Sequence, residues 1–151
     1  MWPVNWFKKR DEEPPPPEEQ LRILAVAMSI DDRVSLGWVG EEHNWKICFT
    51  QSPREAFALA SQRYFEVILC DRTQPGYPWR EVMYRLARCS PQSCILLISP
   101  ASDDDLWQSV LEHGGYDVLI RPLKQNTTVR TIQAALRFIF PEKAVSVGCQ
   151  Y

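Results

Sequence analysis

The sequence predicts an α/β domain built on a doubly wound parallel sheet with helices on both faces. The main observation is that five short apolar runs alternate with five segments of helical spacing. The apolar runs are rich in Ile, Leu and Val, which is typical of strands that are buried on both faces. Strict alternation of strands and helices favours parallel strands joined by helical crossovers. The chain has 151 residues, 45% of them hydrophobic, which is enough for one domain with a continuous core.

The five predicted strands are the apolar runs themselves. They lie at residues 21–28, 45–49, 66–70, 94–99 and 117–120.

Helix signals separate these runs. Ser52 can cap one helix, with Pro53 in its first turn. The acidic run 103–105 is expected to open another helix, because negative charge is favoured at a helix N-terminus, and a metal site there is not expected. The weakest helix is expected at residues 32–43, where two glycines lower helix propensity. The other two are expected at residues 78–88 and from Asn126 up to Pro141.

The ends of the chain differ from the domain, which we place at residues 21–140. Residues 1–20 are a charged, proline-rich lead-in, and residues 141–151 are a C-terminal tail. Four consecutive prolines at 14–17 exclude helix and sheet pairing, so the lead-in is expected to be stiff and solvated. Its aromatic residues are Trp2, Trp6 and Phe7. They are expected either to pack loosely on the domain or be exposed, or to form a short anchor for a partner or a membrane surface.

Composition excludes several classes of function. The net charge of -2 gives no reason to expect nucleic acid as a partner, because phosphate binding requires a basic surface. No apolar run approaches the ~20 residues that span a bilayer, and the first ten residues lack the apolar centre of a secretory signal. The five cysteines include no CxxC pair, so neither a zinc site nor a disulfide scaffold is expected: Cys48, Cys70, Cys89, Cys94 and Cys149. We therefore expect a reduced, cytoplasmic protein.

Three polar side chains follow the predicted strands. Asp71 comes after the third strand, Ser99 ends the fourth and Arg121 follows the fifth. Ligands of such sheets bind at the carboxyl ends of the strands, where these side chains should converge. A carboxylate, a hydroxyl and a cation together suit an aspartyl-phosphate site, in which the carboxylate is the nucleophile and the other two groups stabilise the phosphoryl oxygens. Each residue alone is weak support, and for Asp71 alone a polar loop residue after a strand is the commoner case.

The segment 71–76, with Ser99 and the pair Arg121-Pro122, resembles the receiver domains of response regulators. The resemblance extends over residues 21–139. It implies a flavodoxin-like (CheY-like) fold with strand order 2-1-3-4-5 and a role in two-component phosphorelay signalling. It places Asp71 at the phospho-acceptor position, Ser99 at that of the conserved Ser or Thr, and Pro122 at that of the cis-peptide proline.

The resemblance fails where the family binds Mg²⁺. The acidic pair after the first strand falls on Ala27 and Met28, and neither side chain offers the oxygen ligands that Mg²⁺ requires. Asp31 and Asp32 follow closely and are weak metal candidates. The simpler interpretation is that they cap and charge the first helix.

Two further departures affect switching. The family's lysine is replaced by Arg121, a planar fork that can hold Asp71 in a permanent ion pair. Val118 falls at the position of the family's aromatic switch residue and has no ring to swing. We therefore expect a degenerate receiver, a pseudo-receiver that is not an enzyme and that needs Mg²⁺ only if phosphorylation is retained.

Three functions stay open. The first is a stand-alone degenerate receiver that binds a histidine kinase, another regulator or a second copy of itself, since no room for a DNA-binding output domain is expected after residue 140. Its expected contact surface is formed by the fourth and fifth helices and the fifth strand, and carries Trp107, Gln108, Tyr116, Lys124, Arg130 and Arg137. The second is a conventional receiver that accepts a phosphoryl group on Asp71 from a histidine kinase. The third is a flavodoxin-like small-molecule sensor, which the absence of glycine from residues 27–30 disfavours for nucleotides and flavins.

Overall fold

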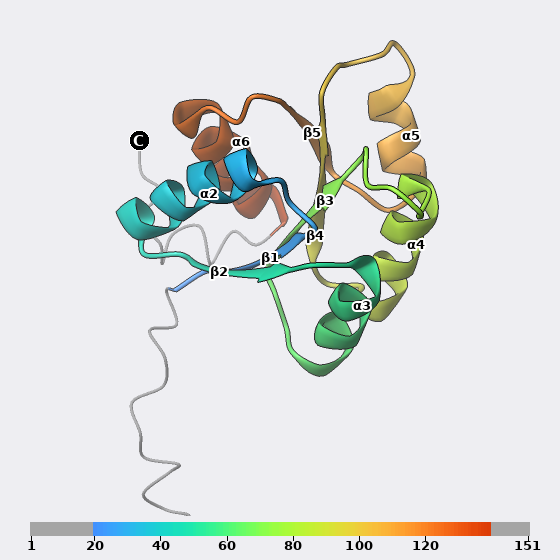
Figure 1. The fold of residues 1–151 in the computed structure, drawn as a ribbon, viewed down its shortest axis with the longest axis horizontal. Helices are drawn as coiled ribbons and strands as arrows, with labels where there is room; N and C mark the ends of the chain where they lie inside the picture. Colours follow the sequence, from blue (N-terminus) through green and yellow to red (C-terminus); the bar gives the residue numbers. More distant parts are fainter. Residues whose placement is uncertain (1–19, 140–151) are drawn as a thin grey trace, which may run out of the picture.

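The computed structural model describes residues 20–139, in which five strands and five helices alternate as predicted (Figure 1). The strands are β1 (Arg22–Val26), β2 (Lys46–Thr50), β3 (Val67–Asp71), β4 (Cys94–Ser99) and β5 (Asp117–Ile120). The helices are α2 (Ile30–His43), α3 (Pro53–Gln62), α4 (Trp79–Cys89), α5 (Leu106–Glu112) and α6 (Gln125–Ile139). None of these helices is long and apolar enough to cross a membrane.

The strands form one parallel sheet in the order β2-β1-β3-β4-β5, which confirms the expected topology. Helices α2 and α6 cover one face of the sheet, and α3, α4 and α5 cover the other (Figure 1). Because side chains alternate along a strand, the three central strands feed both layers. In β4, for example, Leu96 and Ile98 pack toward α2 and α6, whereas Ile95 and Leu97 pack toward the other three helices. This two-sided burial explains why the strands read as continuous apolar runs.

The helix starts follow the predicted signals in part. Ser52 caps α3, and its hydroxyl accepts a hydrogen bond from the backbone N–H of Glu55 at 3.2 Å. Helix α2 begins at Ile30, two residues before the predicted start, because the Ser29 hydroxyl caps it. The acidic run 103–105 stands at the start of α5, as predicted: Asp105 is the N-cap residue, although its side chain makes no cap hydrogen bond, and α5 begins at Leu106. The predicted helix end at Pro141 and the thiol of Cys149 lie outside the described residues.

The two glycines of α2 allow a matched test of packing. A Cβ at Gly37 would meet no atom within 4 Å, whereas one at Gly40 would lie 3.0 Å from the Trp45 carbonyl oxygen and 3.1 Å from Ile47. We expect Gly37→Ala to raise the free energy of unfolding by up to about 1 kcal/mol through helix propensity. Gly40→Ala is expected to be less stable than Gly37→Ala by about 1–3 kcal/mol, because that contact is overpacked. Urea unfolding of the two variants measures the difference, and equal stabilities would contradict the packing of α2 on β2.

Candidate functional site

The carboxyl edge of the sheet brings the predicted polar side chains together. Asp71 is the last residue of β3, Ser99 is the last of β4 and Arg121 follows β5 directly. Parallel pairing in register, with Asp71 opposite Ile98 and Ser99 opposite Ile120, places the three strand ends at one edge. The peptide bond between Arg121 and Pro122 is cis, as the resemblance implied.

Arg121 joins two buried carboxylates. Its Nη2 atom lies 3.0 Å from Oδ2 of Asp71, so the permanent ion pair expected from the sequence is present. The same guanidinium donates from Nε and Nη2 to Oδ2 of Asp32, at 2.9 and 2.7 Å. We refer to Asp32, Asp71 and Arg121 as the arginine bridge.

Asp32 therefore has a role that the sequence did not indicate. It was expected to charge the start of the first helix or, less simply, to serve as a metal ligand. Its backbone N–H does take part in the cap, by donating to Ser29. Its side chain, only 4% exposed, instead turns inward to Arg121. Asp31, which precedes it, is exposed in the first turn of α2 and does fit the helix-charging role.

The environment keeps the bridge charged. The side chains of Asp71 and Arg121 are 9% and 20% exposed. Burial alone would lower the pKa of Arg121, but the hydrogen bonds and negative charges of Asp32 and Asp71 outweigh burial and raise that pKa above its ordinary value. The guanidinium is therefore a fixed cation between the two carboxylates.

The second oxygen of Asp71 is also occupied. Its Oδ1 atom accepts hydrogen bonds from the backbone N–H and the hydroxyl of Thr73, both at 2.9 Å. Both oxygens of the carboxylate thus have protein donors, and nucleophilic attack would have to compete with those contacts.

Ser99 is buried at the same edge, but its hydroxyl forms hydrogen bonds with residues other than Asp71. Its hydroxyl donates to the Ala101 carbonyl at 2.6 Å and accepts from Arg72 Nη1 at 3.1 Å. Arg72 also forms an ion pair with Asp103 at 2.7 Å. The sequence analysis did not single out Arg72, although its place directly after Asp71 was a usable signal. Asp103 thus pairs with Arg72 through its side chain, while its backbone carbonyl accepts a hydrogen bond from Leu106, the first residue of α5.

Comparisons with known proteins agree with this fold. No protein-family model matches the chain. The response regulator PilH of Pseudomonas aeruginosa is 27% identical over 117 residues, which cover 76% of this chain and 97% of PilH. The chemotaxis protein CheY4 of Vibrio cholerae is similar in structure, with a TM-score of 0.71 and 23% identity over 78% of this chain and 99% of that one. The chain thus resembles response-regulator receiver domains in sequence and has their fold. The receiver domain of a putative LuxO repressor protein from Vibrio parahaemolyticus has the same fold, with a TM-score of 0.73 and 16% identity over 83% of this chain and 97% of that one.

The metal that the receiver family implies does not fit the residues of this receiver. The cavity beside Asp71 has a volume of about 670 Å³, and Asp71 is the only carboxylate in its wall. Ala27 and Met28 line the cavity as predicted, and Arg33 adds a cation to it. Gln74 also lines it, with a buried amide oxygen that has no hydrogen-bond partner. Mg²⁺ would meet one carboxylate that is already paired with Arg121, so charge and ligand set both oppose it. In residues 20–139, no group of three or more His, Cys, Asp or Glu side chains is arranged to hold a metal ion.

Val118 and Cys70 lie behind the receiver site. Val118 packs partly buried against the apolar layer under α3, α4 and α5, and as a small aliphatic side chain it has no inward and outward ring positions. Cys70 is fully buried next to Asp71, as expected for a small apolar residue. Burial, reinforced by the charge of Asp71, raises the pKa of its thiol to about 12, and burial together with Asp117 does the same for Cys94.

These two thiols predict a loss of stability in alkali. In the unfolded chain the pKa of each thiol is near its ordinary value of 9.0, whereas in the fold it is about 12. The fold therefore binds more protons than the unfolded chain above pH 9, and their contribution is lost as the pH rises from 9 toward 12. Unfolding midpoints measured across this range should fall less steeply for the Cys70→Ala/Cys94→Ala variant than for the native chain. Parallel curves would show that the thiols do not titrate differently in the two states.

Proposed function

We propose that this receiver is a degenerate one, held in a single state by the arginine bridge, and that it acts by binding another protein and not as an enzyme. The observation that carries the proposal is the contact of Arg121 with both Asp71 and Asp32. In this arrangement Asp71 already has a protein cation as its partner, with which an incoming phosphoryl group and its metal would have to compete. The receiver's resting state is then independent of phosphate.

The two residues that would respond to phosphorylation, Ser99 and Val118, are also unsuited to do so. Ser99 is held by Ala101 and Arg72, and a shift of its hydroxyl toward Asp71 would break both contacts. Val118 offers no ring rotation to transmit such a shift. Each element of a phosphate-driven switch therefore has a competing contact or lacks the required side chain, which supports a constitutive binding module.

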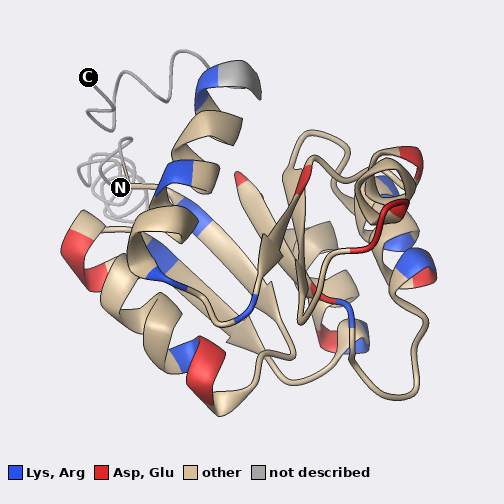
Figure 2. Ribbon diagram, turned by 90° about the horizontal axis from the view of Figure 1, so that it is seen from above, with Lys and Arg blue, Asp and Glu red and all other residues tan. Residues whose placement is uncertain are grey.

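The surface proposed for the partner is formed by α5, β5 and α6. Trp107 and Leu111 lie one turn apart on α5 and are 55% and 42% exposed, and Ile120 at the end of β5 is 40% exposed. Lys124 and Arg130 add exposed cations from the α6 side, and Lys and Arg recur along α6 in Figure 2. Tyr116 is half-buried in the same region. Exposed aromatic and apolar residues beside cations suit a protein partner with an apolar centre and acidic rim.

Phosphorylation is the property that tests the proposal. The native chain is incubated with Mg²⁺ and acetyl phosphate, and its intact mass is measured, with Asp71→Asn as the matched control. We expect no labile mass increase in either protein, because Asp71 is paired with Arg121 and residues 20–139 offer no group of three or more candidate metal ligands. A gain of one phosphoryl group in the native chain that is absent from the Asp71→Asn control would instead identify a conventional receiver.

A further inference from the structure

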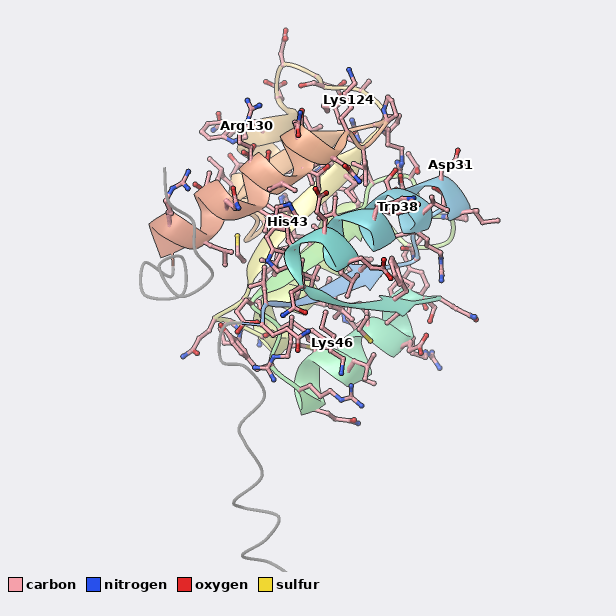
Figure 3. All side chains as sticks on the ribbon, turned by 90° about the vertical axis from the view of Figure 1, so that its left-hand side faces the viewer. Asp31, Trp38, His43, Lys46, Lys124 and Arg130 are labelled. Carbon is pink, nitrogen blue, oxygen red and sulfur yellow. The ribbon has the colours of Figure 1, made fainter. Side chains whose placement is uncertain are left out.

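The outer face of α2 carries an exposed apolar stripe that the receiver site does not use. Ile30, Val34 and Trp38 lie one helical turn apart and are 77%, 55% and 61% exposed. Other apolar residues of the same helix, Leu36 and Val39, are buried against the sheet. Figure 3 shows Trp38 on the side of α2 that faces away from the sheet. Exposed apolar side chains that adjoin in this way suit an interaction surface.

Acidic residues lie at both ends of the stripe, and a groove runs beside it. Its exposed charges are Asp31 at one end and Glu41 and Glu42 at the other, and Figure 2 shows acidic segments at both ends of α2. A groove of about 530 Å³ lies beside it, between α2 and β2, and Gly37 and Glu41 are in its wall. The missing side chain at Gly37 leaves open space there. The surface therefore suits a segment that combines large aromatic side chains with basic residues.

The sequence of the lead-in contains such a segment, and the lead-in joins the domain close to this surface. In the lead-in, Trp2, Trp6 and Phe7 are followed at once by the basic triplet at residues 8–10. The lead-in joins the domain at Gln20, whose side-chain amide lies 3.5 Å from Oδ1 of Asn44, the residue that ends α2. We propose that residues 2–10 lie along α2 as a strap, with the aromatic side chains on the stripe and the basic triplet against Glu41 and Glu42.

The order and length of the segment fit this arrangement. From Ile30 to Trp38 the helix rises about 12 Å, and the five residue steps from Trp2 to Phe7 can span up to about 17 Å. The connecting residues 11–19 can extend to about 30 Å, more than the short distance from Glu41 and Glu42 to the end of α2. Along the sequence, the basic triplet comes closer to Gln20 than the aromatic residues do. In space, the acidic end of α2 is closer to Gln20 than the stripe is, because Gln20 contacts Asn44. The two orders match.

Charge argues against a second copy as the occupant. Pairing two α2 helices through their stripes would bring Asp31, Glu41 and Glu42 of one copy against the same acidic residues of the other. Like charges in contact oppose association. The tethered strap brings the opposite charge, and tethering gives it a high effective concentration without a partner. The strap is a second regulatory surface, separate from the α5–β5–α6 surface, and a protein that docks on α2 must first displace it.

Hydroxyl-radical footprinting of the full chain tests the strap, with oxidation rates of single residues read by mass spectrometry. Trp107 is the internal control, because its exposure of 55% in the domain is close to the 61% of Trp38. Since a tethered segment has an effective concentration on the order of millimolar, we expect Trp38 to oxidise about three- to tenfold more slowly than Trp107. In the Trp2→Ser/Trp6→Ser/Phe7→Ser variant the oxidation rates of Trp38 and Trp107 should become similar.

A charge swap tests the ionic part of the strap. Charge reversal at residues 8–10 should weaken the protection of Trp38, and adding Glu41→Lys/Glu42→Lys to that variant should restore it.

Two results would overturn the strap. Equal oxidation of Trp38 and Trp107 in the native chain would show that the stripe is uncovered. Protection of Trp38 that persists in the triple variant would show that something else covers it, and loss of that protection on dilution would identify a second copy. Neither result bears on the arginine bridge, so the strap and the proposed function can fail independently.

Discussion

Replacing Arg121 with Gln is expected to lower the free energy of unfolding by about 3–5 kcal/mol, because it leaves two buried carboxylates without their cation. Asp32 and Asp71 are 4% and 9% exposed, so water cannot take over the role of the guanidinium without a rearrangement of the site. Urea unfolding at neutral pH measures the loss. Adding Asp32→Asn to the variant should recover part of it, since one of the two stranded charges is then removed.

A second arginine of the same edge provides the control. Arg72 also forms an ion pair, but its partner Asp103 is 56% exposed. Pairs of this kind contribute at most about 1 kcal/mol, so Arg72→Gln is expected to cost far less than Arg121→Gln. Similar losses for the two variants would mean that the arginine bridge is no more than an ordinary surface pair.

Restoring the acidic pair should create a metal site. In the variant Ala27→Asp/Met28→Asp/Arg121→Lys, two carboxylates enter the cavity beside Asp71, and a flexible point charge replaces the planar fork. Ala27 has a φ of 54°, a left-handed conformation that Asp adopts more readily than Ala, so the backbone there accepts the change. Lysine keeps a positive charge near Asp32, so the buried carboxylate of Asp32 still has a cation beside it. We expect this variant to bind Mg²⁺ and to gain a labile phosphoryl group from acetyl phosphate.

The effect is expected to be a change from no detectable phosphorylation to stoichiometric labelling. Intact mass measures it, and the same variant with Asp71→Asn is the control. If the restored receiver folds and binds Mg²⁺ yet stays unlabelled, the missing acidic pair and Arg121 are not what separates this chain from a phosphorylated receiver. Phosphorylation of the native chain to the same extent would show that the missing acidic pair and Arg121 do not prevent phosphorylation.

Most of the fold could be predicted because its signals are local. Each central strand is buried on both sides, so its composition alone marks it, and Ser52 marks the start of α3 within four residues of sequence. That Asp71 and Arg121 lie close together could be predicted from the topology, since both stand at the carboxyl ends of parallel strands. Their direct ion pair followed from the length and charge of arginine.

Distant contacts could not be predicted where a local explanation of the residue was already sufficient. Asp32 and Arg121 are 89 residues apart, and capping of α2 was a sufficient local explanation for an acidic residue at that position. The contact arises in the tertiary structure, where α2 packs against α6 and Arg121 lies shortly before α6. The ion pair of Asp103 was missed for the same reason: its place before a helix was explained by the favourable charge there, whereas its partner Arg72 lies 31 residues earlier.

The most direct test of the central claim is a Mg²⁺ titration of the native chain followed by NMR, with Asp71→Asn as the reference. If the arginine bridge closes the receiver site, the backbone amide signals of Asp71, Thr73 and Ala27 should show no saturable shift at millimolar Mg²⁺, and native chain and variant should behave alike. Saturable shifts in the native chain that disappear in Asp71→Asn would show that Mg²⁺ displaces Arg121 from Asp71, and the receiver would then be a metal-dependent one.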